Sequence, residues 1–281
     1  MQVAAEFRLV SDTLYAAVAF VDRVLSVRRV ERPRLQLVGV AATLVAAKYE
    51  EIYAPTADEF VYITDGTYSR SEVLAAEGDV LAALDFDLSA PTAKTFLRRF
   101  VKAAAADGGF PRADAGGGSE VAGGDPQPSS SGYDRRLAPL AAYVCELALL
   151  EYAALQWLPS TVAAASVAVA RWALGAAPWG AALGRAARTG PAAVAAPAAL
   201  LLAALAGSSS AGPAPPAASA PASSPPAAGP SALPAVRDKY GQPQYLCVAG
   251  LAAPGPLPAD PADWWGPAGA PPSSPAPAAA W

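Results

Sequence analysis

Apolar side chains recur every three or four positions over the first hundred residues, which is the spacing of amphipathic helices. The first such face consists of Leu14, Ala17, Val18, Val21 and Leu25. Pro33 opens a second helix, which is apolar nearly all round as far as Val45 and ends in the polar cluster KYEE at 48–51. A helix without a polar face is usually buried, so we predict that this one is the centre of a bundle.

Two further elements complete the first bundle. A short helix is predicted over 57–63, and the turn Thr64-Asp65-Gly66 closes it. Ser69 and Glu72 then form an S-x-x-E capping box, which predicts a helix that runs as far as Leu84. These are four complete helices, and residues 1–7 are expected to be the end of a fifth.

The helical pattern resumes after a linker at 85–92. Further helices are predicted over 96–101, 137–152 and 159–174, followed by an Ala-rich helix and a compact piece at 236–251. No strand-like alternation is evident. The sequence therefore predicts an all-α protein of two tandem helical bundles, with domains at 1–88 and 89–251.

Three stretches lack core-forming residues. The segments 107–132 and 207–230 are rich in Gly, Ser, Pro and Ala, and 252–281 repeats Pro and Ala around three tryptophans. Such composition does not bury enough apolar surface to repay the entropy of ordering. We predict two disordered insertions and a disordered tail.

Composition argues against several classes of function. The formal net charge is −4, from 20 basic and 24 acidic side chains, which argues against a nucleic-acid binder. The chain has no histidine, and Cys145 and Cys247 form no CxxC pair, so a structural zinc site and a His-based triad are excluded. We expect no cofactor, a buried Cys145 and a reducing, intracellular setting. The apolar run at 192–206 contains Pro197 and is too short to span a bilayer, so no membrane partner is expected.

The stretch from 35 to 100 carries the strongest resemblance to a known family. KYEEI, EFVYITDGTY and the closing L-x-F-x-L-x-x-P-T resemble the cyclin box of A- and B-type mitotic cyclins. SDTLYAAVAFVDRVLS at 11–26 is similar to that family's second helix, and LPSTVAAASVAVAR, VRDKY and YLCVAGL resemble its second fold. The PTxxxFLRRF ending favours the A type, as found in plants and green algae.

The resemblance implies a regulatory subunit that does no chemistry, binds a cyclin-dependent Ser/Thr kinase and holds the kinase's C helix in its active position to control the cell cycle. It implies a nuclear and cytoplasmic location. Lys48 and Glu77 match a charged pair that hydrogen-bonds kinase backbone groups. The matching apolar and flanking polar positions are Tyr49, Leu81, Phe86, Glu50 and Glu51.

The start of the chain departs from the family. The first helix, with its M-R-A-I-L segment for Arg-x-Leu substrates and inhibitors, has no counterpart before Met1, so we expect a truncated chain. Arg32, Leu35 and Gln36 remain from the opposite wall of that docking groove, and Gln2 stands in place of an acidic residue.

These residues also have purely structural interpretations. Lys48 and Glu77 fit solvated surface charges equally well by composition, and Tyr49, Leu81 and Phe86 fit core positions. The pair Glu50-Glu51 does not suggest acid–base chemistry, because adjacent helical residues diverge and no nucleophile accompanies them.

Two other functions compete with kinase activation. One is a transcription-related protein that uses tandem cyclin-like repeats to bind DNA, which the acidic balance disfavours. The other is a helical adaptor that keeps the fold without activating a kinase. Salt-sensitive DNA retention would favour the first of these, and kinase binding without activation the second.

Overall fold

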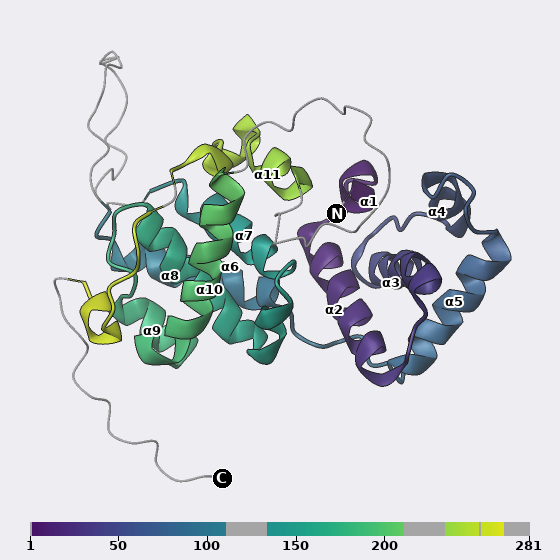
Figure 1. Cartoon of the computed structure of the whole chain (residues 1–281), viewed down its shortest axis with the longest axis horizontal. Coiled ribbons are helices and arrows are strands. Elements are labelled where there is room, and N and C mark those ends of the chain that lie inside the picture. Colours follow the sequence, from purple (N-terminus) through teal and green to yellow (C-terminus); the bar gives the residue numbers. More distant parts are fainter. Residues whose placement is uncertain (1, 111–133, 211–233, 253, 267–281) are drawn as a thin grey trace, which may run out of the picture. The chain divides into compact units, whose positions relative to one another are not determined.

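The computed structural model describes residues 2–110, 134–210, 234–252 and 254–266 (Figure 1). It divides into two compact units, Met1–Thr95 and Phe96–Trp281. Within the described residues the chain is helical, without a strand ladder. A single isolated bridge joins Trp179 and Trp265. The prediction of an all-α protein with two tandem helical bundles is confirmed.

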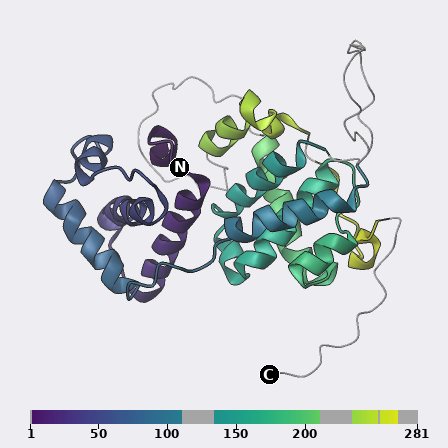
Figure 2. The same ribbon diagram turned by 180° about the vertical axis from the view of Figure 1, so that it is seen from behind.

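The first unit is built around one central helix. Its helices are α1 (Gln2–Glu6), α2 (Ser11–Val27), α3 (Leu35–Glu50), α4 (Ala57–Ile63) and α5 (Arg70–Ala83). In Figures 1 and 2, α3 is seen nearly end-on between α2 and α5. Ala41, Ala42 and Leu44 of α3 are completely buried, as the apolar pattern predicts. Small side chains here let both neighbouring helices approach α3 closely.

Capping boxes begin the two helices that follow α3. Ser69 and Glu72 form the predicted box at the start of α5, with the Ser69 amide donating to Glu72 Oε2 at 2.8 Å. Thr56 and Glu59 form a second box at the start of α4. Each box satisfies amide groups that the first helical turn would leave unpaired. The short element between 57 and 63 is therefore stabilised locally, before any tertiary packing.

The second unit packs its helices against α8. Its members are α6 (Ala93–Asp107), which begins at the boundary, α7 (Leu137–Ala148), α8 (Pro159–Ala173), α9 (Ala181–Ala187), α10 (Pro191–Ser210) and α11 (Pro234–Tyr240). Every residue of α8 from Val162 to Arg171 is buried, against α7 on one side and α10 on another. The predicted helix over 137–152 ends earlier, at Ala148, where a short 3₁₀ helix (Tyr152–Gln156) takes over. Helix α9 was not predicted.

Two buried charges connect the elements of this unit. Arg171 donates to the carbonyl oxygens of Ala177 at 2.8 Å, Ala104 at 2.6 Å and Gly108 at 3.1 Å. Burial lowers the pKa of this guanidinium. On the other side, Glu146 of α7 accepts hydrogen bonds from Lys239 Nζ at 2.6 Å and the Tyr240 hydroxyl at 2.7 Å, which fastens α11 to α7.

The extent of the predicted disorder requires correction at three places, one of which is the end of α10, which runs to Ser210 and so into the insertion predicted at 207–230. Residues 107–110 are packed: Asp107 accepts from the Ala182 and Leu183 amides at 2.7 and 2.9 Å, and Phe110 lies 5.2 Å from the Arg171 guanidinium. These contacts hold the chain by charge and stacking, which composition does not reveal. Most of the two insertions predicted at 107–132 and 207–230 falls within 111–133 and 211–233, outside the described residues, and so does the end of the tail.

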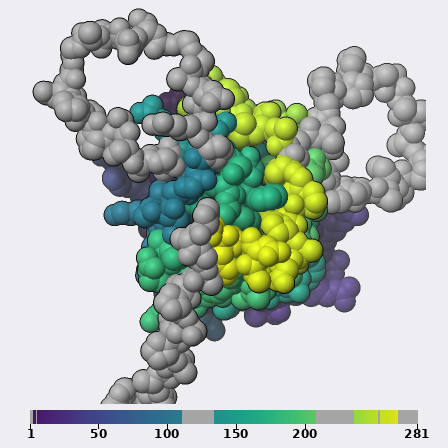
Figure 3. Space-filling view, turned by 90° about the vertical axis from the view of Figure 1, so that its left-hand side faces the viewer, coloured from purple at the N-terminus to yellow at the C-terminus, as the bar shows by residue number. Residues whose placement is uncertain are grey.

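Part of the predicted tail is also ordered. Residues 254–266, yellow in Figure 3, lie against the green helical surface of the second unit. Trp264 is 2% exposed, donates from its indole to the Pro258 carbonyl at 3.0 Å, and accepts at its own carbonyl from the Trp179 amide at 3.0 Å. One buried tryptophan thus orders a Pro- and Ala-rich segment by its large apolar area.

Among the described residues, no single helix has both the length and the apolar character to cross a membrane. The bent pair formed by α9 and the part of α10 up to Gly207 passes that test only jointly, with a bend of 94°.

Candidate protein-binding site

The site is centred on one ion pair between two neighbouring helices. Lys48 lies in the last turn of α3 and Glu77 lies on α5, 29 residues later. Because α3 and α5 pack side by side, Lys48 Nζ comes to 2.6 Å from Glu77 Oε1. The lysine side chain is 49% exposed and the glutamate side chain only 13%. The lysine therefore remains accessible while it orients a largely buried carboxylate.

Large apolar side chains at the end of α3, and in the segments that follow α3 and α5, face solvent. Tyr49 is 50% exposed and Phe86 is 70% exposed, whereas Leu81, one turn beyond Glu77 on α5, is partly buried. Ile52 and Tyr53, at 91% and 92%, are the most exposed of all the large apolar residues described. We call Lys48, Tyr49, Ile52, Tyr53, Glu77, Leu81 and Phe86 the α3–α5 patch. A gathering of exposed apolar residues on this scale marks an interaction surface.

Ile52 and Tyr53 were not among the predicted site residues. They follow the C-cap residue Glu51 of α3 and precede Pro55. The site residues were taken from the resemblance to a family, and the positions matched in this stretch stop at Glu51. The available signal was their position: two large apolar residues in a non-helical connection that is too short to fold back onto a core. Their exposure indicates that the patch continues past the helix end.

The backbone holds Phe86 in an unusual conformation. Helix α5 ends in two consecutive left-handed residues, Asp85 (φ 50°) and Phe86 (φ 56°), and the Phe86 amide donates to the Leu81 carbonyl at 3.0 Å. A bulky residue in this region costs about 1–3 kcal/mol, a strain that clusters at functional sites. The strained turn places an aromatic ring in solvent, where it contributes little to the fold.

The two glutamates after Lys48 differ in their surroundings. Glu50 is exposed, whereas Glu51 Oε1 accepts hydrogen bonds from the Val10 amide at 2.7 Å and the Thr13 hydroxyl at 2.6 Å. Both of these donors lie at the start of α2, and Thr13 is completely buried. Glu51 thus joins the start of α2 to the end of α3, a structural role within the first unit.

The predicted remnant of a docking groove lies at the opposite end of α3. Arg32 begins the short 3₁₀ helix Arg32–Arg34, and Leu35 is 41% exposed at the first position of α3. The Tyr68 hydroxyl lies 3.3 Å from Gln36 Oε1. Arg32, Leu35 and Gln36 are all exposed, and their role in substrate docking stays a prediction.

Comparison with known proteins identifies both units. Residues 1–89 match the family model described as cyclin, N-terminal domain, and residues 91–212 match the cyclin, C-terminal domain. Similar curated proteins include Cyclin-A1-2 of Oryza sativa subsp. japonica, 49% identical over 166 residues, and Putative cyclin-A3-1 of Arabidopsis thaliana, 42% identical over 166 residues. The match covers 59% of this chain but only 30% and 41% of those relatives, so the chain spans less than half of their length.

A solved structure shows the same fold. The viral cyclin of herpesvirus saimiri superimposes with a TM-score of 0.53 at 18% identity, over 72% of this chain and 81% of that chain. At this identity the likeness concerns the fold alone.

Proposed function

This chain belongs to the cyclin family, and we propose that it is a regulatory subunit that binds and activates a cyclin-dependent Ser/Thr protein kinase. Its relatives are A-type cyclins of plants, which supports a role in cell-cycle control. In this proposal the chain performs no chemistry and acts by changing the conformation of the kinase.

The α3–α5 patch is the surface that supports the proposal. A half-exposed lysine beside a largely buried glutamate offers directional, charge-assisted hydrogen bonds to backbone groups of a partner. The exposed side chains of the patch exclude water once they are covered, which strengthens those bonds. The proposal rests on one combination: the ion pair between α3 and α5, and the exposed side chains that follow these helices. Ile52, Tyr53 and Phe86 are each more than two-thirds exposed.

Activation depends on the binding free energy that the patch gives to the active kinase and not to the inactive kinase. Moving a kinase from a 1:99 to a 99:1 ratio of active to inactive states requires about 5.5 kcal/mol of differential binding. Burying a large apolar side chain contributes about 1.5–3 kcal/mol, so Ile52, Tyr53 and Phe86 supply roughly 4–9 kcal/mol before the cost of association. Held inward by this contact, the kinase's C helix would present its glutamate to the ATP-positioning lysine.

Histone phosphorylation by a purified, monomeric cyclin-dependent kinase, with and without this chain, tests the proposal. We expect activity to rise with chain concentration, and the double variant Tyr53→Ala/Phe86→Ala to lose most of that rise. The matched control is Tyr62→Ala, which removes an aromatic side chain that is 86% exposed on α4 and outside the patch.

Each outcome of this assay is informative. Loss of activation in the double variant but not in the control supports the proposal. Binding to the kinase without any rise in activity would instead indicate an adaptor, and equal activation by all three proteins would exclude the α3–α5 patch as the contact.

A further inference from the structure

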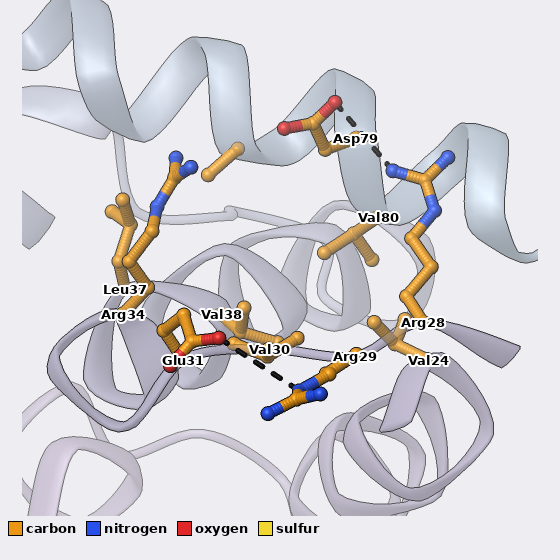
Figure 4. Close-up of a pocket in the computed structure, with 11 residues that line it drawn as sticks. Val24, Arg28, Arg29, Val30, Glu31, Arg34, Leu37, Val38, Asp79 and Val80 are labelled. Atoms are coloured by element: carbon orange, nitrogen blue, oxygen red, sulfur yellow. Dashed lines mark ion pairs between the residues drawn. The ribbon is translucent and has the colours of Figure 1, made fainter. Parts of the chain in front are cut away.

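The first unit contains a pocket that the α3–α5 patch does not use. Its volume is about 220 Å³, and it lies where the end of α2, the connection to α3 and the middle of α5 meet (Figure 4). Its apolar lining consists of Val24, Val30, Leu37, Val38, Ala76 and Val80. Arg34, which lines the pocket, lies just before α3 and 14 residues ahead of Lys48. At 1.5 Å per helical residue, the backbones of Arg34 and Lys48 are roughly 20 Å apart. No lining residue belongs to the α3–α5 patch, although both surfaces use α5: Ala76, Asp79 and Val80 line the pocket, and Glu77 and Leu81 belong to the patch.

The rim of the pocket is positively charged. Arg28, Arg29 and Arg34 line it together with two carboxylates, Glu31 and Asp79, which gives an excess of one positive charge. The segment 28–34 contains four arginines and one glutamate, in a chain whose net charge is −4. Leu35 and Gln36, the predicted groove remnant, are not among the lining residues. We call this site the arginine pocket.

The arginines are only weakly engaged within the chain. Arg28 lies 3.6 Å from Asp79 and Arg29 lies 3.8 Å from Glu31, and both pairs are well exposed to solvent. Exposed pairs at such distances exchange partners readily. Arg34 has no ion-pair partner within 4 Å in the described part of the chain, and, after the hydrogen bonds from Ser69, its nearby positive charge contributes to the lowered pKa of Glu72. In Figure 4, Arg34 and Arg28 stand on opposite sides of the apolar floor, and both reach toward α5.

From this geometry we infer that the arginine pocket binds an extended, acidic segment of another protein. One apolar side chain of that segment fills the pocket, and Asp or Glu side chains on either side of it bind the Arg28 and Arg34 guanidinium groups. Arginine suits this role because its planar fork binds a carboxylate through two parallel hydrogen bonds. The volume is below that of pockets for drug-sized ligands, so it fits one side chain with its adjacent backbone. A nucleic acid fits poorly, since its phosphates would meet Glu31 and Asp79 and its backbone offers nothing for the apolar floor.

Fluorescence anisotropy of a labelled peptide, Gly-Asp-Glu-Leu-Asp-Glu-Gly, tests this inference on the full chain without kinase. We expect saturable binding that weakens as the salt concentration rises. Arg28→Ala/Arg34→Ala should weaken it by at least about tenfold, the effect of losing one charge-assisted hydrogen bond. The control is Arg70→Ala, which removes an arginine of the same unit that is 61% exposed, pairs with Asp58 and lies outside the pocket.

A second peptide with Gly in place of Leu separates docking from general charge attraction. It should bind more weakly than the first peptide, because nothing fills the apolar floor. Equal binding of both peptides, an equal loss in Arg70→Ala, or preferential binding of a single-stranded oligonucleotide would each overturn the inference. Circular dichroism verifies folding, and Arg34→Ala alone provides the same test if the double variant unfolds, because Arg34 holds no ion pair in the described structure.

Discussion

The unequal burial of Lys48 and Glu77 predicts that their single alanine variants differ in stability. In Lys48→Ala the Glu77 side chain, which is 13% exposed, loses its partner, and an acceptor left unpaired in such a largely covered position costs about 1–3 kcal/mol. In Glu77→Ala the remaining lysine is half exposed and is solvated by water, so the loss is within the 0.2–1 kcal/mol typical of exposed pairs. The double variant leaves no orphaned charge, and we expect it to be more stable than Lys48→Ala.

The same two substitutions should affect kinase affinity differently from the stability of the chain. If both side chains hydrogen-bond the kinase, each single substitution removes part of a charged contact that becomes buried, which costs about 2–5 kcal/mol. That corresponds to a loss of at least about 30-fold in affinity. Urea denaturation of the isolated chain and calorimetric titration of the kinase measure the two quantities separately, and Arg70→Ala serves as a surface-charge control in both.

Two results would refute this reasoning. If Glu77→Ala destabilises the chain more than Lys48→Ala does, the burial argument for the pair is wrong. If both single variants bind the kinase as tightly as the unmodified chain, the pair lies outside the contact, whatever its stability.

Three further predictions concern packing and pH. Gly180→Ala should destabilise the second unit by about 2–4 kcal/mol in urea denaturation, because a Cβ at 180 would overlap the Asp107 carboxylate that binds the start of α9. Arg171→Lys should cost about 2–4 kcal/mol by the same measurement, since an ammonium group does not reach three carbonyls, and thermal stability equal to the unmodified chain would contradict this. The hydrogen bonds from the Ser69 amide and hydroxyl lower the pKa of Glu72 below 4.5, so the stability they give is present at neutral pH and is lost as the pH falls through that lowered pKa. Glu72→Gln should flatten this acid dependence of the melting temperature.

The parts of the fold that depend on local signals were predictable. The buried helix α3 follows from its apolar sequence, and the start of α5 follows from the Ser69–Glu72 box. What escaped prediction depends on contacts between residues far apart in sequence. Asp107 caps α9 across 75 residues, and Trp264 is held by the Trp179 backbone. Neither partner is visible in the composition of its own segment.

The candidate site was likewise predictable only in part. Lys48, Tyr49, Leu81 and Phe86 came from a resemblance to a family; the structure places the first two in the last turn of α3 and the others on α5 and just after it. Hydrogen bonding separates Glu51 from them, because its carboxylate accepts from the Val10 amide and the Thr13 hydroxyl at the start of α2. The left-handed turn that exposes Phe86 contains no glycine, so the residue types there do not indicate its backbone conformation.

The contact between the α3–α5 patch and the kinase's C helix can be tested by hydrogen–deuterium exchange on the complex with a cyclin-dependent kinase. We expect exchange to slow in the kinase's C helix and, on this chain, in the segments 48–53 and 77–86. Protection confined to the second unit, or unchanged exchange in the C helix under conditions where the complex forms, would contradict it.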